Sequence, residues 1–237
     1  LSTGDVVSAE CLARWTAPEF GALSPRAFVP LFEQAGLAAA LGLHVIGHAL
    51  AAWAALRDAG LGVAQVSVNL SLPHLLQDDL VAALSDAADR AGVALSRLEV
   101  ELPSHALEHP ELPLVLNRLA ALRALGVTVC LDDATPDCGR LSLLPDLPID
   151  RVKLDGTHVA ALRAGRPAQR AAVDAMLAYA HHAGLRLTAE CVEDEAILRA
   201  LRKRRCPTGQ GYALARPQPL AAILHGGWGL SAAAARC

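Results

Sequence analysis

Several short apolar stretches of this chain end in side chains that can do acid–base or metal chemistry. The two clearest, residues 127–131 and 151–154, deliver two adjacent carboxylates, a lysine and a third carboxylate: Asp132, Asp133, Lys153 and Asp155. Because the C-terminal ends of parallel strands meet at one edge of a sheet, where barrel enzymes keep their chemistry, we expect these groups to lie together. Adjacent Asp residues at a strand end also form turns and cap helices, so on this stretch alone a structural role is an equal alternative.

The same pattern recurs along the chain and favours the chemical interpretation. Collected from successive strand ends, the polar set is Glu10, Asn69, Glu101, Asp132, Asp133, Lys153, Asp155, Glu190, Glu193 and Gln210. So many carboxylates at one edge repel one another unless cations join them. An oxygen ligand set without histidine is typical of Mg²⁺ or Mn²⁺. Two such ions can activate a water molecule and hold a phosphodiester during displacement, and Lys153 would then stand near the nucleophile.

The elements that must position these side chains alternate between strand and helix. Apolar or alternating runs predict strands at residues 6–12, 65–70, 98–102, 127–131, 151–154, 185–191 and 209–212. Helical patterns predict a helix start at Ser24-Pro25 and helices at residues 35–56, 72–91, 114–125 and 168–183. Strand followed by helix predicts an α/β fold with a parallel sheet, and at 237 residues a TIM-like (β/α)8 barrel in one domain. Since a closed barrel needs eight strands, either the first strand lies upstream of Leu1 or the barrel is open at one seam.

Composition limits the class of protein. The formal net charge of −3 and a pI near 6.3 argue against a sequence-independent binder of DNA or RNA, and the basic run at residues 202–205 is interpreted as a solvated helix end. Six cysteines without CxxC spacing favour a reducing compartment, with zinc ligation as the alternative. The N-terminus shows no signal peptide, and a start at Leu1 rather than Met indicates a piece of a longer protein.

Residues 35–56 contain no Asp, Glu, Lys or Arg and are long enough to span a bilayer. We interpret them as a helix of the folded domain because Ala dominates the run and His44 and His48 interrupt it. Helical spacing predicts one buried face made of Leu41, Val45, Ala49, Ala52 and Leu56. We therefore expect no membrane segment in this chain.

A series of short motifs runs through the chain. These are ECLARW at 10–15, SPRAFVPLFEQAGL at 24–37, VNLS at 68–71, LEVE at 98–101, LDD at 131–133, LPIDRVKLD at 147–155, AECVE at 189–193 and QGYALARP at 210–217. In order and spacing the series resembles the EAL domains, phosphodiesterases of the bacterial second messenger cyclic di-GMP. The resemblance covers residues 1 to about 219, with Cys11 in place of the Ala that names the family.

The resemblance implies an eight-stranded barrel whose first strand precedes this chain, and a cytoplasmic bacterial signalling protein. It implies Mg²⁺ or Mn²⁺, at two sites in an active enzyme, held by Glu10, Asn69, Glu101, Asp132, Asp133 and Glu190. Lys153 would assist the attacking water, and Asp155 and Glu193 would complete the catalytic set. Cyclic di-GMP would contact Leu12, Arg14 and Gln210. A protein partner or an attached sensor or GGDEF-type domain would complete the signalling pathway.

Two departures from the family pattern bear on activity. The family's ITES reads Leu102-Pro103-Ser104-His105, so the Glu that steadies the loop after the double Asp is Ser104 here. That loop, DDFGTGYSS in the family, reads DDATPDCGR at 132–140, with its Gly positions changed and Pro136 inserted, so its path and its role in dimerisation are open. The sequence predicts cyclic di-GMP binding with weak hydrolysis to linear pGpG. A catalytically inactive receptor is the main alternative, and an unrelated metal-dependent barrel hydrolase is the third.

Overall fold

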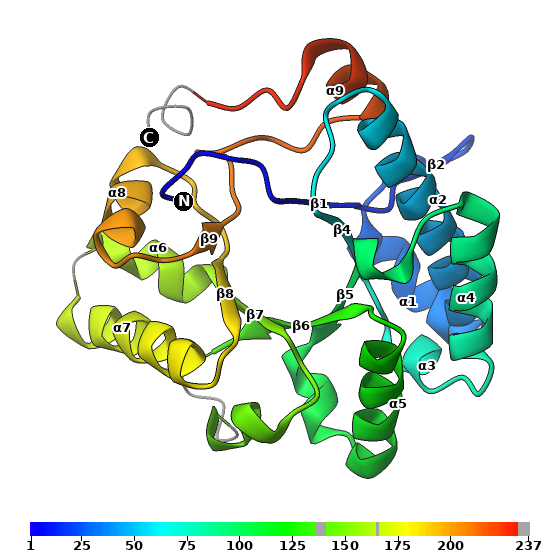
Figure 1. Cartoon of the computed structure of the whole chain (residues 1–237), viewed down its shortest axis with the longest axis horizontal. Coiled ribbons are helices and arrows are strands. Elements are labelled where there is room, and N and C mark those ends of the chain that lie inside the picture. The colour runs from blue at the N-terminus through cyan, green and yellow to red at the C-terminus, as the bar shows by residue number, and fades with distance from the viewer. Residues whose placement is uncertain (136–140, 165, 232–237) are drawn as a thin grey trace. The chain divides into compact units, whose positions relative to one another are not determined.

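The computed structural model describes residues 1–135, 141–164 and 166–231. Its internal contacts divide the chain into two compact units, Val7–Thr128, and Leu1–Val6 together with Val129–Cys237. Each unit has its own parallel strands and its own helices beside them (Figure 1).

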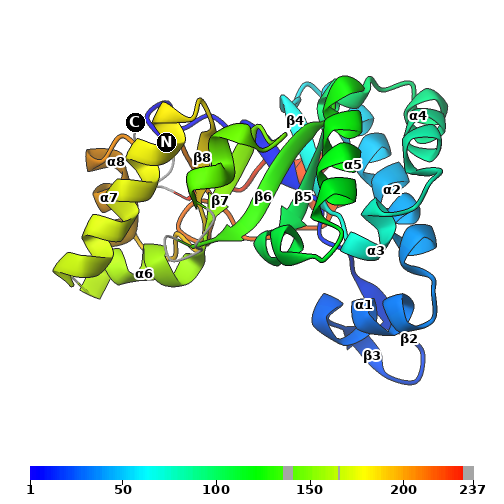
Figure 2. The ribbon, with the colours of Figure 1, turned by 90° about the horizontal axis from the view of Figure 1, so that it is seen from below.

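The unit Val7–Thr128 is built on three parallel strands in the order β1-β4-β5. Its elements are β1 (Ser8–Glu10), β2 (Trp15–Ala17), β3 (Gly21–Leu23), α1 (Pro25–Gln34), α2 (Ala38–Asp58), β4 (Gln65–Asn69), α3 (Leu72–Leu75), α4 (Leu80–Ala91), β5 (Leu98–Pro103) and α5 (Leu112–Ala124), with 3-10 helices at Leu95–Arg97 and Ser104–Glu108. Strands β2 and β3 pair antiparallel and stand with α1 at one end of the unit (Figure 2).

The strands of this unit have one apolar and one polar face. In β4, Val66 and Val68 are completely buried, and alternation places Asn69 on the opposite face. In β5, Glu99 and Glu101 alternate with the buried apolar residues in the same way. The parallel register pairs Asn69 with Glu101. The polar face of this sheet therefore ends in an amide and a carboxylate side by side.

The second unit holds four parallel strands in the order β6-β7-β8-β9. Its elements are β6 (Thr128–Ala134), β7 (Arg151–Leu154), α6 (Gly156–Ala164), α7 (Pro167–His182), β8 (Arg186–Ala189), α8 (Glu195–Lys203), β9 (Thr208–Gly209) and α9 (Leu220–Gly226), with a 3-10 helix at Leu141–Asp146. Helices α6, α7 and α8 lie on one side of β7 and β8 (Figure 1).

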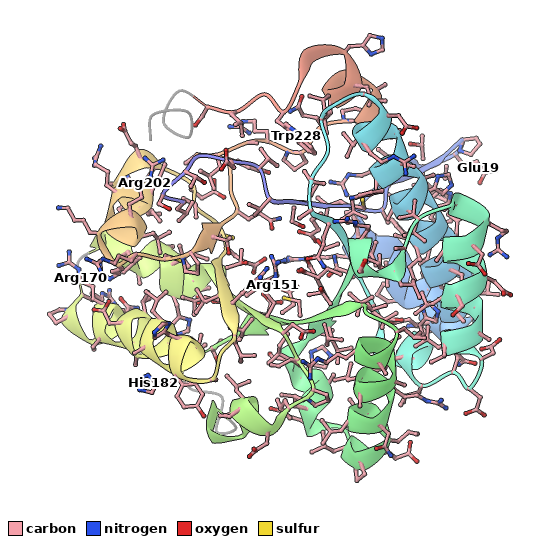
Figure 3. All side chains as sticks on the ribbon, in the orientation of Figure 1. Glu19, Arg151, Arg170, His182, Arg202 and Trp228 are labelled. Atoms are coloured by element: carbon pink, nitrogen blue, oxygen red, sulfur yellow. The ribbon has the colours of Figure 1, made fainter. Side chains whose placement is uncertain are left out.

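Strand β7 buries charge on one face and apolar residues on the other. Val152 and Leu154 are completely buried, and Arg151 and Lys153 alternate with them. Figure 3 labels Arg151, which extends from β7 on the side away from α7. The register pairs Lys153 with Thr188, two residues before Glu190 on the neighbouring strand. The C-terminal end of β7 thus delivers a lysine next to the carboxylate that follows β8.

The described chain contains seven parallel strands, three in one unit and four in the other, which is consistent with a barrel whose first strand is missing. The single helix expected over residues 72–91 is two helices, because the polar residues Gln77, Asp78 and Asp79 interrupt its apolar spacing. The hairpin β2-β3 and helix α6 were not expected. Strands β2 and β3 and helix α6 are short, and short elements depend on tertiary packing more than on the local sequence pattern.

Helix α2 is, within the described residues, the one helix long and apolar enough to cross a membrane by length and composition. In this structure it packs against β4, α3 and α4. Its buried face differs in part from the expected one. Ala49 and Leu56 are buried, but Ile46, Leu50 and Trp53 join them, whereas Leu41, Val45 and Ala52 are only half-buried. Because nearly every position of α2 is apolar, the sequence pattern alone does not select which face is covered.

Two glycines of α2 allow a matched test of this packing. A Cβ on Gly42 would lie 2.0 Å from Nδ1 of His74, a buried side chain of α3, whereas a Cβ on Gly47 would have nothing within 4 Å. We expect Gly42→Ala to lower the free energy of unfolding by about 1–3 kcal/mol, because the buried imidazole must move. Gly47→Ala should raise it by up to about 1 kcal/mol, because Ala favours the helix. Urea denaturation measures both, and equal stability of the two variants would contradict this packing.

Candidate active site

Strand β6 carries a bulge at Asp132 and Asp133. Leu131 pairs with Val152 and Ala134 pairs with Leu154, so β6 advances by one residue more than β7 between these pairs. Asp133 has φ +52°, in the left-handed region that Asp tolerates better than most residues. A regular strand would send consecutive side chains to opposite faces. The bulge instead turns both carboxylates toward one point.

Three carboxylates converge beyond the ends of β6 and β8. Ligand oxygens of Asp132, Asp133 and Glu190 all lie within 4.8 Å of one another. The buried Lys153 lies beside them, with its Nζ 2.8 Å from Glu190 Oε1 and 3.4 Å from Asp132 Oδ1. Burial raises the pKa of Glu190, and the charges of Asp132 and Asp133 add to this effect while Lys153 opposes it. The charge of the Lys153 ammonium can therefore offset only part of the negative charge of these three carboxylates.

The cluster fits a divalent cation. Among the residues that the structure describes, the buried Oδ1 of Asp132 accepts no hydrogen bond, although the Lys153 ammonium is near it. Three carboxylates also gather beside the Lys153 ammonium, which carries a single positive charge. A hard dication with oxygen ligands would satisfy both the unbonded oxygen and the excess of negative charge. The residues at this point thus match the ligand set that the sequence predicts for Mg²⁺ or Mn²⁺.

A second polar group lies at the strand ends of the unit Val7–Thr128. Asn69 donates a hydrogen bond from Nδ2 to Glu10 Oε1 at 2.7 Å, and Glu101 is its buried partner in the register of β4 and β5. Because the amide nitrogen of Asn69 donates to Glu10, its amide oxygen is directed elsewhere and can serve a cation. Burial, and then the charges of Glu10 and Glu101, raise the pKa of Cys11 to about 11. The thiol therefore stays neutral beside these carboxylates and is a poor zinc ligand.

Asp155 accepts hydrogen bonds at the start of helix α6. Its carboxylate accepts hydrogen bonds from the backbone N–H of Thr157, at 2.8 Å, and from the Thr157 hydroxyl, and His158 Nδ1 lies 3.5 Å away. Burial works to raise the pKa of Asp155, but these hydrogen bonds and His158 lower it below its usual value. Asp155 is thus an ionised group that fixes the start of α6, which directly follows β7.

The remaining predicted site residues lie on loops. Glu193 is exposed just after β8. The backbone N–H of Gln210 donates to Ala189 O at 2.8 Å, so Gln210 is held beside the strand end that carries Glu190. In the other unit, Leu12 and Arg14 are exposed between β1 and β2, and the guanidinium of Arg14 donates to Ala13 O at 2.8 Å. An exposed apolar and a cationic side chain in one short loop suit a nucleotide ligand.

Sequence reasoning missed the contact that joins the loops after β7 and β8. Cys191 follows Glu190 with φ +49°, and its Sγ would lie 2.3 Å from a Cβ on Gly156. Only glycine fits at position 156, directly after Asp155, and this allows the loop that carries Glu190 to approach the start of α6. The sequence signal that could have predicted this close approach is Gly156, a glycine directly after the strand-end residue Asp155.

Comparisons with known proteins agree with this arrangement. Residues 1–217 match the family described as EAL domain. The chain belongs to the EAL domain family. An uncharacterized protein of Mycobacterium bovis is 33% identical over 95% of this chain and 36% of its own length. The "Cyclic di-GMP phosphodiesterase NbdA" of Pseudomonas aeruginosa is 33% identical over 94% of this chain and 28% of its own length. The EAL domain thus spans about a third of the length of these curated relatives.

The fold is also that of solved EAL proteins. The structure described as "PaMucR Phosphodiesterase, c-di-GMP complex" superposes with a TM-score of 0.86 at 29% identity, and the match covers 93% of this chain and 89% of that one. The predicted TIM-like barrel of the EAL type is thereby confirmed. EAL domains depend on metal ions, and the cluster of Asp132, Asp133 and Glu190 is the place in this chain where described carboxylates gather for one.

Asp133→Asn tests the cluster with little change of shape. Asn tolerates the left-handed backbone as Asp does, but its side chain carries no charge. We expect the affinity for Mn²⁺ to fall on the order of tenfold or more, while the free energy of unfolding changes by less than about 1 kcal/mol. Calorimetric titration with Mn²⁺ measures this. Glu195→Gln, at an exposed carboxylate of α8 that pairs with Arg199, is the control. Unchanged Mn²⁺ affinity in Asp133→Asn would rule out this residue as a ligand.

Proposed function

We propose that this EAL domain binds cyclic di-GMP and hydrolyses it slowly to linear pGpG with Mg²⁺ or Mn²⁺. The observation that carries the proposal is the bulge of β6, which gathers Asp132, Asp133 and Glu190 around Lys153. The names of relatives support the substrate, since one is a cyclic di-GMP phosphodiesterase and a solved phosphodiesterase of this fold is a c-di-GMP complex. We take the two compact units as halves of one EAL domain, because the family match runs through both.

The metal ligands that we propose are those that the family resemblance implies, namely Glu10, Asn69, Glu101, Asp132, Asp133 and Glu190. Bound ions would neutralise phosphate charge and lower the pKa of a water molecule. In hydrolysis the water oxygen bonds to phosphorus while the bond from phosphorus to the ribose 3′ oxygen breaks, and the leaving oxygen gains a proton. Lys153 is held by Glu190 and Asp132, so its positive charge remains where the attack takes place.

The other site residues have supporting tasks in this proposal. Arg14 binds the dinucleotide through its guanidinium, and Leu12 packs against it. Gln210 adds a polar contact beside the strand end of β8. Glu193 completes the acidic group, and Asp155 keeps the start of α6 fixed behind Lys153.

Slow turnover is proposed from the segment that follows Asp133. Ser104 begins the 3-10 helix after β5, and its hydroxyl is shorter than the glutamate that the family pattern has there. Ala134 and Thr135 are the described residues of the changed loop, and Pro136 with residues 137–140 lies outside the described residues. A displacement of about 1 Å at a reacting centre can reduce a rate on the order of a hundredfold. We therefore expect the domain to keep its affinity for cyclic di-GMP while its rate of hydrolysis falls.

The same two departures favour a second candidate function. In it the domain is a catalytically inactive cyclic di-GMP receptor that acts through a protein partner or through an attached sensor or GGDEF-type domain. The relatives are about three times as long as this match, which leaves room for attached domains. Both candidates imply a cytoplasmic bacterial protein that binds neither DNA nor RNA.

Arg14→Ala tests where the dinucleotide binds. Loss of a charge-assisted contact of about 1.5–3 kcal/mol should weaken binding of cyclic di-GMP about tenfold to a hundredfold. Calorimetry in EDTA measures affinity without turnover. Arg26→Ala, at an exposed arginine of α1 in the same unit, is the matched control and should bind normally. Equal affinity in Arg14→Ala and Arg26→Ala would contradict the placement.

The hydrolytic proposal is tested by a loop graft that leaves every proposed metal ligand in place. Residues 134–140 become FGTGYSS and Ser104 becomes Glu, and both proteins are incubated with cyclic di-GMP and Mn²⁺. We expect slow formation of pGpG by the parent and a rate on the order of a hundredfold higher in the graft, measured by chromatography.

The possible failures of this experiment have different meanings. A folded graft that binds cyclic di-GMP but is no faster than the parent would show that the loop does not limit the rate. No product from either protein would favour the receptor. A parent that is already fast would exclude both the slow-turnover proposal and the receptor.

A further inference from the structure

Helix α2 carries two histidines one turn apart on its exposed side. His44 and His48 are four residues apart, and their ring centroids are 4.5 Å apart with an interplanar angle of 66°. Both side chains are exposed, whereas the opposite face of α2 is buried against β4, α3 and α4. A helix of otherwise apolar character thus presents two imidazoles to solvent as a preformed pair.

We propose that His44 and His48 form a surface site for a transition-metal dication of the Ni²⁺ and Cu²⁺ class. Two imidazole nitrogens bound to one ion at about 2.0–2.1 Å and at a right angle place their ring centres about 4.5 Å apart, whereas a tetrahedral angle places them about 5 Å apart. The spacing of the His44 and His48 rings corresponds to the right-angle arrangement. Ni²⁺ and Cu²⁺ adopt right-angle geometry with imidazole ligands.

The surroundings of the pair leave room for the other ligands of such an ion. The exposed positions one turn before and about one turn after it are Ala40 and Ala51, and a Cβ on the neighbouring Gly47 would meet nothing within 4 Å. Water molecules can therefore complete the coordination. The sequence of α2 contains no Asp, Glu, Lys or Arg before Arg57, so no charge on the nearby turns of the helix competes for the imidazoles.

The histidine pair differs in chemistry from the carboxylate cluster. Imidazole favours Ni²⁺ and Cu²⁺, whereas the oxygen ligands of Asp132, Asp133 and Glu190 suit Mg²⁺ and Mn²⁺. The proposal therefore does not rest on the proposed hydrolysis. An ion on His44 and His48 joins two successive turns of α2, so it binds the folded helix in preference to the unfolded chain. Bound Ni²⁺ should consequently stabilise the protein against heat.

The test is calorimetric titration of the full chain with Ni²⁺ in excess Mg²⁺, together with thermal unfolding with and without Ni²⁺. We expect one Ni²⁺ site whose affinity falls on the order of tenfold or more in His44→Ala and in His48→Ala. The decisive variant is Ala40→His combined with His48→Ala, which moves the pair one turn toward the start of α2. It should regain affinity to within about threefold of the parent, along with the increase in melting temperature. His181→Ala, on α7, is the control and should bind normally.

Three results would overturn the proposal. They are the absence of Ni²⁺ binding by the parent, unchanged affinity in His48→Ala, and failure of the relocated pair to recover binding although it unfolds at the parent's temperature without Ni²⁺. The melting temperatures without metal identify a variant that is merely misfolded. In that case, His44→Gln and His48→Gln, which keep a polar side chain at the same exposed positions, decide the question.

Discussion

Two consecutive aspartates of β6 can reach one cation only because the strand does not continue regularly beyond Leu131. The extra residue and the left-handed backbone of Asp133 bring both carboxylates to the same side, where Glu190 arrives from the end of β8. Each part of this arrangement is unfavourable alone. A non-glycine residue at positive φ costs on the order of 1 kcal/mol, and three carboxylates close together repel one another. A bound dication is the partner that would make the arrangement stable.

The buried ammonium of Lys153 lies between two of these carboxylates. It bridges Glu190 and Asp132 and so offsets part of their repulsion, but burial still raises the pKa of Glu190. Strained backbone and perturbed carboxylate pKa values each cluster at functional sites. The close contact of Cys191 with Gly156 fits the same interpretation, because it fixes the loop that carries Glu190 against the start of α6.

Much of the fold and of the candidate site could be predicted from the sequence, because polar residues at strand ends and the order of motifs are local signals. The placement of Asn69 beside Glu101, and of Lys153 near Glu190, follows from alternation along parallel strands in register. The bulge could not be read, because it depends on how β6 pairs with β7. The prediction of the buried face of α2 was also wrong in part. Nearly every position of α2 is apolar, so the sequence does not distinguish the buried face from the exposed one. The hydrogen bond from Thr157 to Asp155 could not be read from the sequence either, and the catalytic role expected of Asp155 stays a prediction.

We propose that the carboxylates gathered by the bulge of β6 are metal ligands. A crystal of the full chain soaked in Mn²⁺ and measured at the manganese absorption edge tests it most directly. We expect an anomalous peak with bonds to oxygens of Asp132, Asp133 and Glu190, and displacement of the Lys153 ammonium from at least one of its two carboxylates. Occupied Mn²⁺ sites only at cysteine or histidine side chains, with Lys153 still joined to Glu190 and Asp132, would contradict the claim.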